Sequence, residues 1–219
     1  MIINDLIKDF YWIFLKKRNF SQSNEEEMIK KIFEGQNEGF YIDIGCHHPM
    51  RYSNTAYLYK VGWSGINIDA DRKNLNLFKF FRRRDINLNY FISKKKKHID
   101  YCVFNERALN GIYDKKRLEV LGTSGYKPIE VKRMETYSLD EILSLYKIEN
   151  KKIDFLDIDV EGHDFEVLKS INLNLIYVKV ILIEVGEKQR NIELYLRDYG
   201  YSKFFKEDRN VFFIKDKDD

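Results

Sequence analysis

The chain has 219 residues and is 44% hydrophobic, which is enough for one domain with a sizeable core. Its 15% aromatic content argues against a disordered chain. The 38 basic and 35 acidic residues leave a formal net charge of +3, so the overall charge does not call for a polyanionic partner.

The first twenty residues predict an amphipathic helix, because apolar residues recur there at helical spacing. Asp5, Lys8 and Asp9 interrupt the segment before a signal-peptide core or a membrane span can form. We expect residues 1–37 to form helices that pack on a single folded unit, residues 38–219. Peripheral contact of the first helix with a membrane surface or a partner chain is the alternative.

A second helix is predicted from the capping-box pattern of Ser23 and Glu26. The two cysteines, Cys46 and Cys102, lie far apart and form no metal-binding spacing, which favours a cytoplasmic, reducing setting. The chain length is compatible with either a monomer or a homodimer.

Apolar runs and helix-compatible stretches alternate along the rest of the chain, which predicts a doubly wound α/β domain with a mostly parallel sheet. The predicted strands are 40–44, 65–68, 89–92, 153–158 and 178–185, with further candidates at 99–104 and 129–134. The predicted helices are 54–61, 72–81, 138–146, 164–170 and 189–199. Residues 201–205 and 210–214 predict a C-terminal antiparallel hairpin.

Two segments fit this pattern less well. Residues 106–127 contain Gly111, Gly122 and Gly125 and predict a long loop, either a lid over a site or a surface insertion. Residues 79–97 hold Arg82 to Arg84 and Lys94 to Lys97. This basic segment is either a patch for phosphate, acidic glycan or membrane, or a solvated loop.

Polar residues stand where the predicted strands stop, and ligands of open α/β sheets bind beyond those ends. Gly45 lets the backbone approach a ligand, and Asp43 can orient the first turn or accept a ligand ammonium. Asp69 ends the second strand, where nucleotide-binding folds accept ribose hydroxyls. Its alternative role is a helix N-cap, which Asp71 fills more naturally.

A second group of acids lies around the fourth long strand. At a strand's period of two, Asp157, Asp159 and Glu161 point the same way, and Glu184 can join them. Such like charges need a cation, a proton or a ligand. Asp159 and Glu184 are therefore candidate ligands of Mg²⁺ or another divalent cation, or Asp159 is a general base without a metal. His47, His48 and His163 fall in the same strand-end turns and are further candidate bases.

The ordered segments FYIDIGCHHPMRYSNTAYLYKVGWSGINIDAD, RRRDINLNYFIS, METYSLDEIL, IDFLDIDVEGHDFEVLKS and ILIEV resemble the FkbM-type family of S-adenosylmethionine (SAM) dependent methyltransferases. The resemblance implies a Rossmann-like class I fold with a seven-strand sheet. It also implies SAM contacts by Asp43, Gly45, Cys46, Ser53, Asn54, Asp69, Ala70, Asp85, Ile86, Asn87, Ser93 and Asp157.

The same resemblance places residues Asp159 to Gly162 beside the transferred methyl. We assign Asp159 as the catalytic base or metal ligand, with Glu161, His163 and Glu184 in support. The chain departs from the common pattern at its first turn, where HHP replaces a small residue, so His47, His48 and Arg51 are assigned to the substrate.

We therefore predict a SAM-dependent O-methyltransferase that acts on a hydroxyl of a glycan or small molecule, with divalent-metal assistance as an option. The alternatives are ribose methylation of RNA, which the basic segment favours, and a non-catalytic SAM-binding module. A nucleic-acid partner is not our first expectation, because the regular basic and aromatic interleaving of an RNA groove is missing.

Overall fold

The structure of the chain is a computed structural model that describes residues 19–216. The predicted first helix, and the membrane or partner contact expected of it, lie outside these residues. Among the described residues, no helix is long and apolar enough to cross a membrane.

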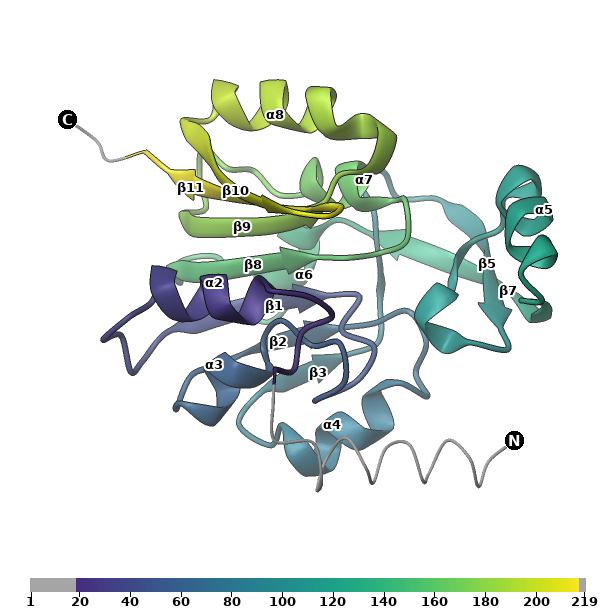
Figure 1. Cartoon of the computed structure of the whole chain (residues 1–219), viewed down its shortest axis with the longest axis horizontal. Helices are drawn as coiled ribbons and strands as arrows, with labels where there is room; N and C mark the ends of the chain where they lie inside the picture. Colours follow the sequence, from purple (N-terminus) through teal and green to yellow (C-terminus); the bar gives the residue numbers. More distant parts are fainter. Residues whose placement is uncertain (1–18, 217–219) are drawn as a thin grey trace.

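A seven-stranded sheet forms the centre of the molecule, in the order β10-β11-β9-β8-β1-β2-β3 (Figure 1). The five strands from β9 to β3 are parallel, and β10 and β11 close the sheet as an antiparallel hairpin. This confirms the predicted fold class. The strands are β1 Phe40–Ile44, β2 Ser64–Ile68, β3 Ile86–Leu88, β8 Ile153–Ile158, β9 Val178–Glu184, β10 Tyr201–Glu207 and β11 Asn210–Lys215.

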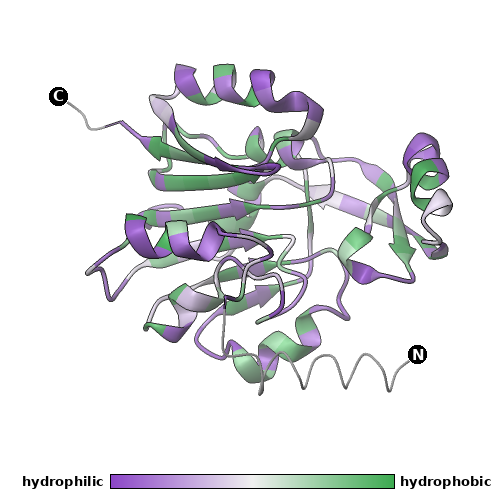
Figure 2. Ribbon diagram, in the orientation of Figure 1, coloured by the Kyte–Doolittle hydropathy of each residue, from purple (hydrophilic) through white to green (hydrophobic). Residues whose placement is uncertain are grey.

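Helices cover both faces of the sheet, because each buried strand presents apolar side chains alternately to the two sides. Ile42 and Leu156 face one hydrophobic cluster with α6, α7 and α8, whereas Tyr41 and Phe155 face another with α2 and α3. Figure 2 shows hydrophobic residues concentrated in these strands, while α8 carries both kinds of residue. The helices are α2 Glu25–Ile32, α3 Ala56–Lys60, α4 Leu75–Phe81, α6 Leu139–Leu145, α7 Asp164–Leu168 and α8 Gln189–Asp198.

The third strand of the main sheet differs from the prediction. The apolar run 89–92 was expected there, but β3 is Ile86–Leu88, and the chain leaves the sheet at Asn89. The side-chain amide of Asn89 donates hydrogen bonds to the backbone oxygens of Asp69 and Ala70. Backbone pairing with β2, and not an apolar pattern, thus defines this strand.

A second sheet of four strands lies beyond the carboxyl ends of the parallel strands (Figure 1). Its order is β4-β7-β5-β6. The segment 106–127, predicted to be a loop, instead contains a short 3₁₀ helix η2, strand β6 and helix α5. The elements are β4 Phe91–Ile92, β5 His98–Phe104, η2 Arg107–Leu109, β6 Gly111–Ile112, α5 Lys115–Thr123 and β7 Pro128–Tyr137.

The predicted capping box of the helix α2 is wrong. Helix α2 begins at Glu25 after Asn24, which makes no side-chain capping bond. The Glu26 carboxylate accepts the backbone N–H of Phe20, so it ties the preceding segment to the helix. A complete capping box occurs instead at α6, between Ser138 and Glu141.

The predicted basic segment 79–97 does not form one surface patch, because Arg82 is fully buried. Its guanidinium donates to the Pro49 backbone oxygen at 2.8 Å, to the Ser53 hydroxyl at 3.0 Å and to the Tyr41 hydroxyl at 2.8 Å. The Asp85 carboxylate is its buried counter-charge, at 3.8 Å. Arg82 therefore holds the loop after β1 against α4, while Lys94 to Lys97 remain exposed.

We expect Arg82→Ala to lower the free energy of unfolding by about 3 to 5 kcal/mol, because it leaves the Asp85 carboxylate buried without its cation. Urea denaturation measures this loss. The neighbouring Arg83 is exposed, so Arg83→Ala is a matched control expected to change stability by no more than about 0.5 kcal/mol. Equal effects of the two substitutions would contradict the structural role of Arg82.

Candidate functional site

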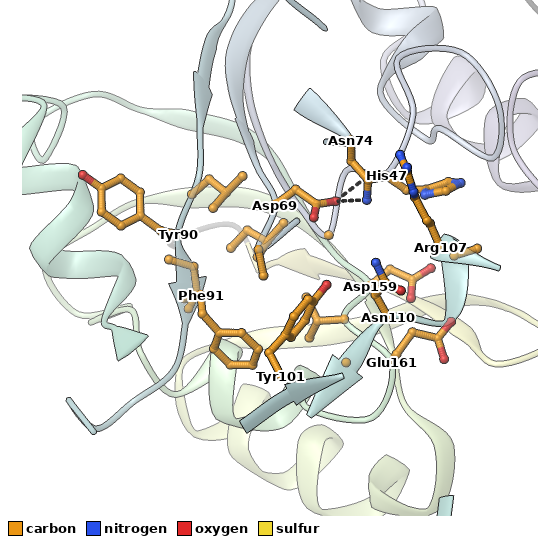
Figure 3. Close-up of a pocket in the computed structure, with 18 residues that line it drawn as sticks. His47, Asp69, Asn74, Tyr90, Phe91, Tyr101, Arg107, Asn110, Asp159 and Glu161 are labelled. Carbon is orange, nitrogen blue, oxygen red and sulfur yellow. Dashed lines mark hydrogen bonds between the residues drawn. The ribbon is translucent and has the colours of Figure 1, made fainter. Parts of the chain in front are cut away.

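A cavity opens at the carboxyl ends of β1, β2 and β8. Residues after these strands form its floor, and Tyr90 to Ile92, with residues of β5, η2 and β6, form the opposite wall. Figure 3 shows Tyr90 and Phe91 at one end, Asp159, Glu161 and Arg107 at the other, and Asp69 between them. The cavity thus has an aromatic end and a charged end.

Close backbone contact between two strand ends shapes the cavity floor. Gly45 has a φ of +89°, and a Cβ at this position would lie 1.8 Å from the Asp159 backbone oxygen. The Gly45 N–H donates to the Ile68 oxygen at 2.9 Å, and the Asp159 N–H donates to the Ile44 oxygen at 3.0 Å. Glycine is required here for both conformation and space.

Asp69 lies at the middle of the cavity, where the sequence placed a ribose-binding acid. Its Oδ1 accepts the Asp71 N–H, and its Oδ2 accepts the His47 N–H and the Asn74 side-chain amide. Burial raises the pKa of Asp69 to about 6, although these hydrogen bonds oppose the shift. Since a carboxylate has about four lone-pair sites, one site on Oδ1 remains for a ligand hydroxyl.

The two acids in β1 and β8 lie side by side on one face of the sheet, since Asp43 is in register with Asp157 in the parallel strand pair. Asp43 accepts the Thr55 hydroxyl at 2.6 Å, and Asp157 accepts the Asn54 amide at 3.1 Å. Burial raises the pKa of Asp43 to about 6 and raises that of Asp157 well above its usual range. Neither side chain lines the cavity.

The acids after β8 do not share one direction, contrary to the period-of-two prediction. The strand ends at Ile158, and Glu161 has a left-handed φ of +57°. Asp159 instead joins Asp164 and Glu184, whose carboxylate oxygens lie within 4.8 Å of one another. Glu161 turns to Arg117 of α5, with which it forms an ion pair at 2.9 Å.

Electrostatic crowding is strongest at Asp159. Desolvation by surrounding protein atoms, followed by the charges of Glu184 and Asp164, raises the pKa of Asp159 well above its usual range. Burial likewise raises the pKa of Glu184 to about 7 and that of Asp164 to about 6. Asp159 nonetheless keeps accessible surface, because it faces the cavity. The Asp159 carboxyl group can therefore exchange a proton with a ligand in the cavity.

The same three acids are the candidate metal ligands, but two of them already have partners. Glu184 pairs with Arg209 at 3.0 Å, and Asp164 accepts the N–H groups of Val160 and Gly162 at 2.9 and 3.0 Å. A bound cation is thus not needed to account for the positions of these two side chains.

A second cavity, with about 1330 Å³ of empty space, adjoins the first. Glu161 lines both cavities, and Asp164 and Glu184 line the second. Helix α5 forms one wall, and the 3₁₀ helix η3 Gly186–Lys188, with Ile192 of α8, forms the other. The acidic group of Asp159, Asp164 and Glu184 thus lies at the junction of two cavities, one of which α5 helps to enclose.

Several predicted cofactor residues do not line the first cavity. Cys46 packs with Leu75 and Phe78, and Ser53 binds Arg82. Asp85 lies just before β3, at its amino end, and accepts the Gly65 N–H and the Tyr41 hydroxyl. Ile86 and Asn87 follow it within β3, and Ser93 and Asn54 are also outside the lining.

His163 pairs with a buried hydroxyl instead of facing open space. Its Nε2 lies 3.0 Å from the Ser93 hydroxyl oxygen, and its ring packs on Phe91. Burial lowers the pKa of His163 to about 4, so the imidazole is neutral at neutral pH. This supports a positioning role.

The three residues assigned to the substrate form a tight loop after β1. His48 accepts the backbone N–H groups of Met50 and Arg51 on Nδ1, and His47 Nε2 lies 3.0 Å from Arg51. Burial lowers the pKa of both histidines to about 3. His47 lines the first cavity, and none of the three lines the second.

Sequence reasoning missed the residues that the second sheet and its insert contribute. Tyr101, Arg107, Asn110 and Gly111 line the first cavity, and Arg117 lines the second. The one available signal was the length of segment 106–127, which made a lid over a site one of two readings. Asn74 was missed because it lies outside the recognised motifs. Tyr90 was missed because the run 89–92 was predicted to be a strand of the main sheet.

An open α/β sheet with an acid after its second strand and a cavity at its carboxyl edge is typical of α/β proteins that bind nucleotide-like ligands. Residues 43–203 match the family model of the methyltransferase FkbM domain. The chain belongs to this family and is a SAM-dependent methyltransferase.

A solved structure of a TehB-like SAM-dependent methyltransferase from Corynebacterium glutamicum is similar to the chain, with 12% identity and a TM-score of 0.48. The similarity covers 98% of this chain and 97% of the other. No curated protein matches the sequence.

We expect Gly45→Ala to abolish SAM binding measured by isothermal titration calorimetry, because the new Cβ would collide with the Asp159 backbone. Gly125→Ala is a matched control, since Gly125 also has a positive φ, of +80°, but has no atom within 4 Å of a new Cβ. The control should lose only about 1 kcal/mol of stability and bind SAM normally. Normal SAM binding by folded Gly45→Ala would contradict this assignment.

Proposed function

We propose that this SAM-dependent methyltransferase transfers a methyl group to a hydroxyl of a sugar or glycan. In this proposal SAM binds in the first cavity, and the acceptor enters through the second. The observation that carries the proposal is the position of Asp159, whose carboxylate faces the first cavity and neighbours the two acids that line the second.

The residues of the first cavity fit SAM in one orientation. Tyr90 and Phe91 offer ring surfaces to adenine, and the remaining acceptor site of Asp69 suits one ribose hydroxyl. A second ribose hydroxyl can bind Asp69 only if it replaces one of the N–H groups that already donate hydrogen bonds to this carboxylate. The charged end, near Asp159 and Arg107, suits the sulfonium and amino-acid portion.

Bound SAM supplies an electrophilic methyl group on a sulfonium sulfur, and the neutral thioether is a good leaving group. The protein must then align the acceptor oxygen and take its proton. An Asp159 carboxylate oxygen is the group we assign to accept that proton. Its raised pKa, and the neighbouring Glu184 and Asp164, provide a site where one proton can be held.

Glu161 and His163 act beside Asp159 as positioning residues in this proposal. Glu161 is fixed by Arg117 and forms the boundary between the cavities. His163 is fixed by Ser93, and its neutral ring supports Phe91. Neither needs to carry the transferred proton.

A sugar acceptor is supported by the mixed wall of the second cavity. Phe165 and Leu121 give apolar surface for the C–H face of a sugar ring, and charged side chains stand beside them. We do not extend the proposal to RNA, because Arg82 is buried and the basic segment is therefore not a continuous patch.

A SAM-consumption assay against a panel of glycosyl acceptors tests the proposal, with mass spectrometry to locate the added methyl group. We expect methylation on oxygen. Methyl transfer to nitrogen, or to RNA ribose in place of sugars, would contradict the proposal.

We expect Asp159→Asn to reduce the methyl-transfer rate by about 10² to 10⁴-fold, the usual contribution of a general base. The wild-type rate should rise with pH above the ordinary carboxylate range, because the raised pKa of Asp159 shifts the appearance of its base form to higher pH. Rate–pH profiles under single-turnover conditions measure both effects. Glu149→Gln is the control, because it makes an equivalent change from acid to amide at a residue that lines neither cavity. A fully active Asp159→Asn would refute the assignment.

We expect EDTA to leave methyl transfer unchanged, because Glu184 already forms an ion pair with Arg209 and Asp164 already accepts two backbone N–H groups. The measurement compares initial rates of enzyme treated with EDTA before and after Mg²⁺ is restored. Loss of activity that Mg²⁺ restores would establish metal assistance at the acidic group.

A further inference from the structure

Two elements far apart in the sequence face each other across the second cavity. Helix α5 contributes Lys116 and Arg117 to one side, and η3 contributes Glu187 and Lys188 to the other. Lys116, Glu187 and Lys188 are exposed, so they stand at the rim, whereas Arg117 is partly buried further in. The entrance to this cavity is therefore lined with charge.

Most carboxylates that line the cavity are already engaged. Glu161 and Glu184 pair with arginines, Asp164 accepts two backbone N–H groups, and Asp114 caps α5 through the Arg117 N–H at 2.7 Å. Glu187 is the remaining acid, and the described residues offer it no ion-pair partner within 4.0 Å.

The two lysines at the rim, in contrast, have no ion-pair partner among the described residues. Neither Lys116 nor Lys188 has a carboxylate within 4.0 Å among residues 19–216, and Lys188 has only a long contact of 3.4 Å to the Gly162 oxygen. Two uncompensated ammonium groups thus face one uncompensated carboxylate at the rim. The unpaired charges at the rim therefore have an excess of one positive charge, which can attract an anionic group.

Arg117 lies deeper in the wall. Its Nη2 donates to Glu161 and to the Leu109 oxygen, each at 2.9 Å, but its Nη1 is buried without a hydrogen-bond partner in the described chain. That nitrogen lies 2.7 Å from where a Gly111 Cβ would stand, so the guanidinium packs against the backbone that separates the cavities. Because Nη1 is buried and Nη2 is engaged, Arg117 adds positive charge to this wall without a free terminal nitrogen for direct contact with a ligand.

We propose that the acceptor is an anionic sugar, one that carries a carboxylate or a phosphate group. The anionic group is bound by Lys116 and Lys188 at the rim, while a hydroxyl of the same sugar reaches Asp159. This inference rests on the proposed function, because it concerns the acceptor side of the same reaction.

The test compares matched acceptors that differ only in the charged group. Methyl glucosides, galactosides and mannosides are each supplied in three forms: neutral, as the uronate, and as the 6-phosphate. SAM consumption by the full-length enzyme gives kcat and KM, and saturation-transfer NMR gives binding of each sugar independently of turnover. The uronate and phosphate arms distinguish the two sources of negative charge.

We expect at least one anionic form to be methylated with a KM at least about tenfold below that of its neutral partner, equivalent to one charge-assisted contact. A double variant, Lys116→Ala with Lys188→Ala, should raise this KM by about tenfold or more, with little change in kcat or in the KM for SAM. Higher salt should raise the KM of wild type and narrow its difference from the variant.

The double variant Lys94→Ala with Lys95→Ala is the control, because it removes the same charge from exposed positions outside both cavities. Equal methylation of neutral and anionic sugars, with a silent Lys116 and Lys188 variant, would overturn this inference and leave the proposed function intact. Failure to methylate any sugar, with activity on another acceptor class, would overturn both.

Discussion

The ligand-facing end of the molecule depends on the buried guanidinium of Arg82. A charge in that position is costly unless its hydrogen bonds are satisfied, and the loop after β1 satisfies them with the Pro49 oxygen and the Ser53 hydroxyl. The same loop begins with His47, whose N–H binds Asp69 at 3.0 Å. Arg82 does not line the cavity, but through this loop it helps to fix the position of Asp69 within it.

Close backbone packing between β1 and β8 fixes the position of the acids that follow β8. At Gly45 and Asp159 the ends of β1 and β8 approach so closely that no side chain fits between them. This contact fixes the direction in which the chain leaves β8, and the left-handed turn at Glu161 then separates Glu161 from Asp159. One carboxylate therefore belongs to an acidic group with Asp164 and Glu184, while the other belongs to the wall formed by α5. The two proposed roles, proton acceptance and separation of the cavities, follow from that divergence.

Carboxylates are concentrated where positive or proton-bearing ligands are expected, and cations are concentrated at the entrance proposed for the acceptor. The raised pKa values of Asp159, Glu184 and Asp164 reflect desolvation together with mutual repulsion, which a shared proton relieves. The uncompensated lysines lie on α5 and η3, at the opposite walls of the second cavity. The proposed proton acceptor and the proposed recognition residues thus lie at the junction and at the rim of the same cavity.

The sequence by itself determined the parallel sheet, its C-terminal hairpin and the acids after β2 and β8, because buried parallel strands need continuous apolar runs that stop at the ligand edge. It did not determine β3, since that strand is defined by pairing with β2 and its residues show no apolar run. Only the tertiary structure decided that Arg82 is internal, that Asp85 serves the amino end of β3, and that segment 106–127 brings Arg107 and Arg117 to the two cavities. These outcomes depend on contacts between residues far apart in the chain, and local periodicity carries no information about such contacts.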